Sequence, residues 1–351
     1  MTGTFNHDML VLARESRAMN RTELAERLNV SQPYVSHMEG GHREPSAEVL
    51  DRLCTTLGYP RSFFFQQDER RGLGLSVMFY RKKAATKAAD IHRLEAEVNI
   101  RRMLVRRLIS EVDISTPHRV EFLDIDEHGH DPEKIAALVR ASWQLPSGPV
   151  QNLVRVIEAA GGIVFKFAFG TRDIDAISMW PRDTPPLFFI NAEAPADRVR
   201  FSLCHELGHV VMHETATETM EAEANRFASE FLMPESLIGS DLSGLTLTRA
   251  ASLKPVWRVS MASLVYRARD LGRISDNDFK HMFRRLSVTG QRKKELVDIA
   301  GEDPVLVDDL LRELRESSGH TTESLAQLLC LHEADFANRF ERKPGELRLS
   351  Q

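Results

Sequence analysis

Apolar and polar residues follow a helical period over most of this chain. In the first 65 residues, apolar side chains recur at three- and four-residue intervals between short polar turns, which predicts a compact all-helical unit. From Gly72 to about Asp113, apolar residues recur every three to five positions within a basic stretch, and this spacing predicts one long amphipathic helix. Two further helices are expected at about residues 132–143 and 149–160, the second ended by Gly161-Gly162.

The spacing of apolar residues is no longer helical after Gly161-Gly162. Three short runs rich in β-branched and aromatic residues, GGIVFKFAF, IDAISMW and PLFFIN, predict three strands of a small sheet. Helical spacing returns at about 197–213 and 218–232, and Met233-Pro234 stops the second of these helices. The remainder, about 240–345, has the spacing of further helices, and we detect neither an internal repeat nor a chemical motif in it.

Length and composition limit the class of protein. At 351 residues the chain is long enough for two or three domains, and its 42% hydrophobic and 28% charged residues are typical of a soluble globular protein. No apolar run approaches the ~20 residues of a membrane-spanning helix, and the first residues lack a secretory pattern. We therefore expect a cytoplasmic protein without a membrane partner.

Charge and cysteine content further restrict the possible class of protein. The chain has 46 basic and 51 acidic residues, and a net charge of -5 excludes binding of nucleic acid by bulk charge alone. Residues 71–118 are locally basic, and this excess belongs either to the solvated face of a connector or to contacts with phosphate. The three cysteines, Cys54, Cys204 and Cys330, form no C-x-x-C motif and are expected to be buried thiols.

Residues 20–41 contain two helices joined by a tight turn. Asn20 can cap the first helix, and Ser31 can cap the second, with Pro33 in its opening turn. The apolar seam between the two helices consists of Leu24, Ala25, Leu28, Val30, Val35 and Met38. This helix-turn-helix resembles the Xre/Cro-type DNA-binding domain over about residues 7–65.

The resemblance implies that the helix from about Ser31 to Glu39 enters the major groove of a double-stranded DNA operator, bound by a homodimer. Its candidates for contacts with base edges are Gln32, Tyr34 and His37. Its candidates for phosphate contacts are Arg21, Ser36 and Arg43. The alternative is a fold kept to bind a protein partner, which the acidic excess of the first 70 residues favours.

A second motif, His205-Glu206-Leu207-Gly208-His209, is an H-E-x-x-H sequence within an apolar helix. The i, i+4 spacing places His205 and His209 on one helix face within reach of one metal ion. Glu206 can then meet a water molecule held by that ion. His213 lies about 12 Å along the helix axis from His205, so we expect it at the helix end or in a supporting position.

A metal site of this kind needs a third protein ligand, and the next helix offers Glu221, Glu223 and Glu230. Glu221 shares a helix side with Asn225, whereas Glu223 is rotated from it by about 200°. We therefore predict Glu221 as the ligand. Asn225, one turn later, can hydrogen-bond a coordinating histidine.

The paired motifs resemble the ImmA/IrrE family of metallopeptidases. The resemblance covers about residues 130–235 and rests on RFSLCHELGH followed by E-x-E-A-N-x-F-A and LMP. It implies a gluzincin-like domain in which His205, His209 and Glu221 bind one divalent metal ion, zinc or else manganese or iron, and Glu206 is the catalytic acid/base. Family behaviour implies a protein substrate, a transcriptional repressor. The rival hypothesis is a transcription factor whose zincin-like domain is a non-catalytic sensor or dimerisation module.

The predicted fold class is multidomain and mainly α. A helix-turn-helix domain is expected at residues 1–70 and a basic helical connector at 71–118. An α+β metallopeptidase domain with a small sheet is expected at 119–239, and a helical C-terminal region of unknown role at 240–351.

Overall fold

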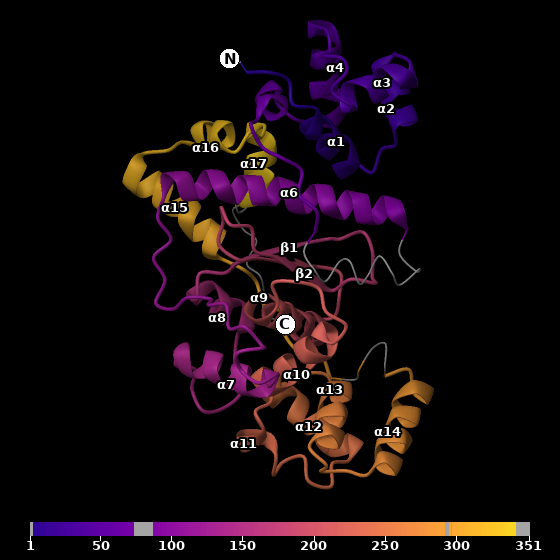
Figure 1. Ribbon diagram of the computed structural model, residues 1–351, viewed down its shortest axis with the longest axis vertical. Coiled ribbons are helices and arrows are strands. Elements are labelled where there is room, and N and C mark those ends of the chain that lie inside the picture. The colour runs from indigo at the N-terminus through magenta and orange to yellow at the C-terminus, as the bar shows by residue number, and fades with distance from the viewer. Residues whose placement is uncertain (1–2, 74–86, 292–294, 296, 342–351) are drawn as a thin grey trace. The chain divides into compact units, whose positions relative to one another are not determined.

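The computed structural model describes residues 3–73, 87–291, 295 and 297–341, and these divide into two compact units. The N-terminal unit comprises residues 3–73, 87–114 and 306–341. The central unit comprises residues 115–291, 295 and 297–305. Figure 1 labels most of their elements. The predicted fold class is confirmed, because both units are mainly helical and the central unit holds one small sheet.

Polar side chains cap several helices of the N-terminal unit. Asn20, Ser31 and Ser46 cap α2, α3 and α4 as N-cap residues with extended backbone. The elements are α1 (His7–Ser16), α2 (Arg21–Leu28), α3 (Gln32–Glu39), α4 (Ala47–Leu57), the 3-10 turn η1 (Arg61–Phe65), α6 (Ala88–Glu111), α15 (Leu306–Ser318), α16 (Thr322–Leu328) and α17 (Glu333–Phe340). One apolar cluster joins the core of α1 to α4 with residues of α6.

The helix predicted as a basic connector is packed into this unit as α6. Arg102 is fully buried, and its guanidinium donates to Asp68 Oδ1 at 2.7 Å and to the Glu69 carbonyl at 2.8 Å. Arg106 pairs with Asp68, and Arg101 pairs with Glu97. These three charges are neutralised within the unit, which argues against phosphate contacts by these arginines. The part of that stretch at 74–86 lies outside the described residues.

The central unit is built around three short strands. Its helices are α7 (Pro132–Ser142), α8 (Leu153–Ala159), α9 (Ala196–Met212), α10 (Met220–Leu232), α11 (Glu235–Ile238), α12 (Leu247–Trp257), α13 (Met261–Asp270) and α14 (Asp276–Val288). The strands β1 (Ile163–Phe167), β2 (Ala176–Met179) and β3 (Leu187–Asn191) have the spatial order β1-β3-β2. Strand β3 pairs in parallel with β1 and antiparallel with β2. Strands β2 and β3 are buried along their whole length, and α9 packs against both of them.

The predicted C-terminal region does not stay together. Helices α12 to α14 contribute to the core of the central unit, for example through Ala250, Leu264 and Leu286. Helices α15 to α17 belong to the N-terminal unit. Apolar spacing defines a helix but not which core that helix joins, so the sequence pattern does not contain this division.

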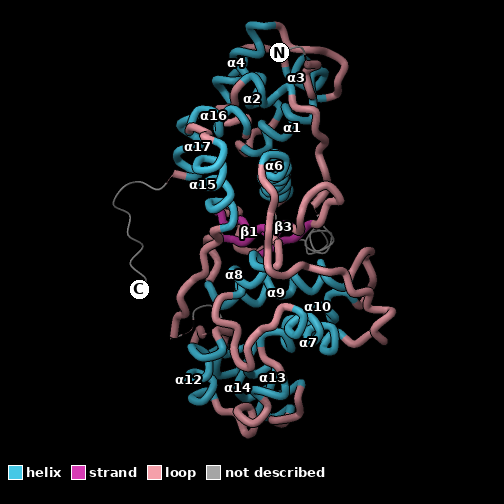
Figure 2. Tube along the Cα trace, turned by 90° about the vertical axis from the view of Figure 1, so that its left-hand side faces the viewer, coloured by secondary structure: helices cyan, strands magenta, loops and turns pink. Residues whose placement is uncertain are grey.

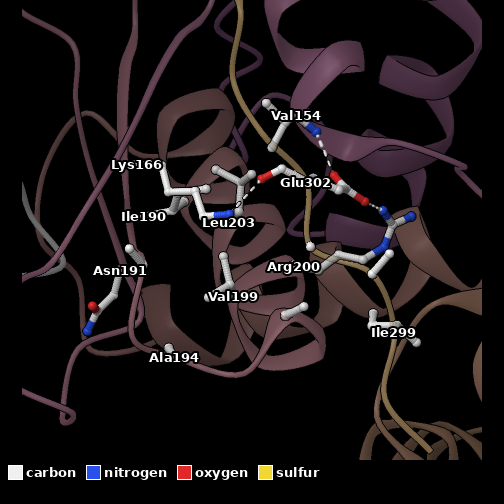
Figure 3. Close-up of a pocket in the computed structure, with 14 residues that line it drawn as sticks. Val154, Lys166, Ile190, Asn191, Ala194, Val199, Arg200, Leu203, Ile299 and Glu302 are labelled. Carbon is white, nitrogen blue, oxygen red and sulfur yellow. Dashed lines mark hydrogen bonds and ion pairs between the residues drawn. The ribbon is translucent and has the colours of Figure 1, made fainter. Parts of the chain in front are cut away.

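A cavity of about 220 Å³ lies within the central unit, lined by α9 on one side and by residues 299–302 on another (Figure 3). Glu302 lies at its edge, where it accepts from the Val154 backbone N–H at 2.9 Å and forms an ion pair with the buried Arg200. Lys166 donates to Asp303 at 2.8 Å. These contacts fasten the segment 297–305 to α8, α9 and β1.

Candidate metal centre and helix-turn-helix

The H-E-x-x-H motif lies in the second half of α9, where this helix crosses α10. Gly208 makes the close approach feasible, because a Cβ at this position would come within 3.0 Å of the Phe227 ring. Cys204 is fully buried, its Sγ lies 4.0 Å from the Ala228 carbonyl, and burial raises the pKa of its thiol. The cysteine therefore packs between the helices, as the sequence predicts.

The three predicted ligands converge between α9 and α10. The Nε2 atoms of His205 and His209 are 3.0 Å apart. The Glu221 carboxylate lies 3.5 Å from the first of them through Oε2 and 3.3 Å from the second through Oε1. Ligand atoms bound tetrahedrally at the usual zinc–nitrogen distance are about 3.3 Å apart. The three side chains can therefore hold one ion.

Hydrogen bonds orient both imidazoles toward the same point. His205 Nδ1 lies 3.1 Å from the side-chain oxygen of Asn225, an acceptor, so the ring donates from Nδ1 and directs the Nε2 lone pair at the centre. Asn225 thus lies within hydrogen-bonding distance of the first predicted ligand, His205.

His209 is oriented by His213, for which the sequence predicts a helix-end or supporting position, and by Glu223, which helix geometry excluded only as a ligand. The Glu223 carboxylate lies 3.1 Å from His213 Nε2 and accepts its proton, so His213 Nδ1 accepts from His209 Nδ1, 3.0 Å away. His213 and Glu223 are both buried. Glu223 thus stands outside the ligand group and acts on it through two histidine rings. The i+4 spacing of His213 from His209 was the available signal.

The donor set fits a cation. Both Nε2 atoms face the same 3.0 Å gap, and the buried Glu221 Oε1 has no hydrogen-bond partner there. Burial raises the pKa of Glu221, but the neighbouring His205 and His209 outweigh this effect and lower the pKa to about 2. Two nitrogens and one ionised carboxylate are ligands that zinc, manganese and iron all accept.

Glu206 lies beside this centre and is 1% exposed. Ser178, in the middle of β2, donates from Oγ to Glu206 Oε2 at 2.6 Å. Sequence analysis missed Ser178. Its only local signal is a hydroxyl within the otherwise apolar strand AISM.

The helix-turn-helix consists of α2 and α3. On α3, Gln32 and His37 are exposed, whereas Tyr34 and Ser36 are half-buried. Arg43 stacks over the Tyr34 ring at 4.3 Å. Arg21 is half-exposed and donates to the buried Glu39 at 2.6 Å. The six predicted DNA-contact residues thus lie on or next to α3, and three of them, Arg21, Tyr34 and Arg43, have partners within the domain.

Comparisons with known proteins assign both modules. Residues 10–64 match the helix-turn-helix family model, and residues 157–269 match the IrrE N-terminal-like domain, a peptidase family model. The chain therefore carries an Xre-type helix-turn-helix domain followed by an IrrE N-terminal-like domain, as the motifs predict.

Curated relatives align with the first of these modules. The transcriptional regulator ClgR of Mycobacterium tuberculosis is 40% identical over 55 residues, which are 16% of this chain and 49% of ClgR. An uncharacterized HTH-type transcriptional regulator of the same species is 46% identical over 44 residues, 12% of this chain and 31% of that protein. The chain spans half or less of the length of these relatives. In the part of the chain that the structure describes, no helix is long and apolar enough to cross a membrane.

Proposed function

We propose that this protein is a DNA-binding transcriptional regulator with a metal-dependent endopeptidase domain. Its substrate is another regulator, a transcriptional repressor, whose cleavage switches gene expression. The observation that carries the peptidase assignment is the convergence of His205, His209 and Glu221 on one point, with Glu206 next to them. One divalent ion per chain, zinc or else manganese or iron, fits this donor set.

The residues have distinct tasks in peptide hydrolysis. When bound, the metal ion supplies Lewis-acid polarisation of the scissile carbonyl and lowers the pKa of a water molecule. Glu206 takes a proton from the attacking water and passes it to the leaving amine. Ser178 holds one oxygen of the Glu206 carboxylate in place at 2.6 Å, which fixes the direction in which Glu206 accepts the proton.

The DNA-binding assignment rests on α3. Gln32, Tyr34 and His37 contact base edges in the major groove, and Arg21, Ser36 and Arg43 contact phosphates of a double-stranded operator. The exposure of Gln32 and His37 supports this assignment. A homodimer would place two such helices on the two halves of one site. The cell compartment that fits this function is the cytoplasm.

A cleavage assay with a defined probe tests the peptidase. Zinc-loaded wild type and Glu206→Gln are incubated with a proteome-derived peptide library, and mass spectrometry counts new amino termini. We expect cleavage by the wild type alone and equal zinc content in both proteins. Equal counts from both proteins would contradict the proposal and favour a non-catalytic sensor or dimerisation domain.

A further inference from the structure

The C-terminal helices α15, α16 and α17 repeat the geometry of α1, α2 and α3. The N-caps of α2 and α16 are Asn20 and Thr321, and each forms a capping box with the third residue of its helix. Two residues before each cap, Ala18 and Gly319 have left-handed backbone, with φ of 54° and 69°. The same sequence separation, 301 positions, relates both pairs.

The turns between the second and third helices also correspond. Asn29 has φ 51° and Cys330, again 301 positions later, has φ 52°. The same two backbone hydrogen bonds close both turns: Asn29 to Glu26 and Val30 to Ala25 in the first, and Cys330 to Gln327 and Leu331 to Ala326 in the second, all between 2.9 and 3.1 Å. The same turn and the same caps in both copies define the geometry of the two helices more closely than the spacing of apolar residues does.

The buried seams follow the same register. Each position in the first set corresponds to one in the second. The first set is Met9, Leu10, Ala13, Leu24, Ala25, Leu28 and Val35, and the second is Leu310, Leu311, Leu314, Leu325, Ala326, Leu329 and Phe336. In both copies an arginine of the first helix pairs with a glutamate near the end of the third, Arg14 with Glu39 and Arg315 with Glu341, although these two glutamates are 302 positions apart and not 301. Residues 306–341 therefore repeat residues 5–40 element by element.

The two copies differ in charge. Residues 5–40 contain four arginines and five acidic residues, whereas residues 306–341 contain three arginines and eight acidic residues. Arg312 and Arg315 pair with Asp309 and Glu341, each at 2.6 Å. Glu333, in the first turn of α17, corresponds to Gln32 of α3 and is exposed. Binding to DNA depends on neutralising phosphates, so this surface is poorly suited to it.

The second copy packs against α6 instead. Helix α15 contacts α6, and Cys330 joins the apolar cluster that contains Ile100 of α6 and the core of α1 to α4. In Figure 2, which views α6 end-on, α15 to α17 lie beside α6, and α1 to α4 lie on another side of it. Burial raises the pKa of Glu97 on α6, but Arg101, Arg339 of α17 and Arg17 together lower it. Glu97 therefore lies within the field of cations from both copies.

We infer that residues 306–341 are a second helix-turn-helix that serves as an intrachain partner of the first, docked on α6, instead of binding DNA. Its position on α6 leaves α3 as the single DNA-contacting helix of each chain. This last statement rests on the proposed DNA binding by α3, whereas the docking itself does not.

The docking is tested in the full chain by hydrogen exchange of Cys330→Asn. Asparagine tolerates left-handed backbone, so the turn is kept, while a larger polar amide, which cannot form an ion pair with Arg107 of α6, enters the apolar cluster. We expect amides of α6 to exchange roughly tenfold faster or more, with α16 and α17 still protected. Cys330→Ala, which keeps the contact apolar, is the matched control. Unchanged exchange in α6 would overturn the docking, and loss of protection throughout 321–341 in both variants would overturn the self-contained second motif.

The division of labour is tested by selection from a random duplex DNA library. Equivalent positions are substituted in the full chain, Gln32→Ala and His37→Ala in α3, and Glu333→Ala and Asn338→Ala in α17. We expect the selected sequence to change for the α3 pair and to stay the same for the α17 pair. A changed sequence for the α17 pair would overturn the inference. A wild type that selects no sequence contradicts the proposed DNA binding by α3, and the exchange experiment still decides the docking.

Discussion

The metal centre and the surface of α3 differ in how firmly they hold their functional side chains. In the metal centre, His205, His209 and Glu206 each form a hydrogen bond with a neighbouring side chain, and the partners of His209 and Glu206 are buried. On α3, Gln32 and His37 project from an exposed helix face. Peptide hydrolysis needs atoms fixed to within fractions of an ångström, whereas contacts with bases adjust as the DNA docks. The contrast predicts that the centre is sensitive to changes behind its ligands and that α3 is sensitive only at its surface.

The largest effect is expected for Glu206→Gln. The amide keeps the shape and the Ser178 contact but cannot carry the proton, so peptide cleavage should fall by roughly 10³-fold or more. Because Glu206 is no ligand in this scheme, zinc content and DNA affinity should stay at wild-type values. Rates of peptide cleavage, elemental analysis and DNA titration on the same preparation check this. Lost DNA binding would show that the two sites are not separable.

Removal of a ligand comes next. Glu221→Ala removes the carboxylate that faces both histidines at 3.3 and 3.5 Å, so metal should be absent after gel filtration. Glu230→Ala is a control on the same helix, since Glu230 pairs with Arg267 away from the centre. Elemental analysis of both proteins is the measurement. Full metal content in Glu221→Ala would require a different third ligand.

A smaller loss of metal affinity is expected when the residues that support His209 are substituted. His213→Phe and Glu223→Ala remove the support of His209 without removing a ligand, and each should weaken metal affinity by roughly 10–100-fold. The combined variant should weaken it little further, because the two residues act in series on one ring. Competition with a fluorescent chelator measures the affinities. Full additivity of the two effects would show that the residues act independently.

The smallest effects are expected on α3. Gln32→Ala should weaken binding to the preferred DNA site by about 1–3 kcal/mol and leave random DNA nearly unaffected. Arg43→Ala should weaken both and lower the salt dependence of binding, because phosphate contacts carry little base information. Titrations with both DNAs at several salt concentrations distinguish these outcomes. Equal losses for Gln32→Ala on both DNAs would remove that residue from base recognition.

Most of the candidate site residues were predicted from patterns that involve only a few neighbouring residues. The caps Asn20 and Ser31, and the i, i+4 pair His205 and His209, depend on residues within one or two helical turns. The choice of Glu221 over Glu223 follows from helix geometry alone, and the structure brings Glu221 to the two histidines. The second helix-turn-helix also has local signals in the sequence: its caps and its left-handed positions lie 301 residues after those of the first. Its different composition concealed this repeat.

The amino-acid sequence by itself determined the two modules, the helix faces and the order of the elements. These depend on caps, periodicity and spacing, which act over a few residues. Tertiary structure alone decided that Ser178 meets Glu206 across 28 positions, and that residues 306–341 join the core of the N-terminal unit. It also decided that arginines of α6 pair with acids instead of staying solvated. Such contacts depend on which buried surfaces fit together. The spacing of apolar residues shows which face of a helix is buried, but it does not show against which element that face packs.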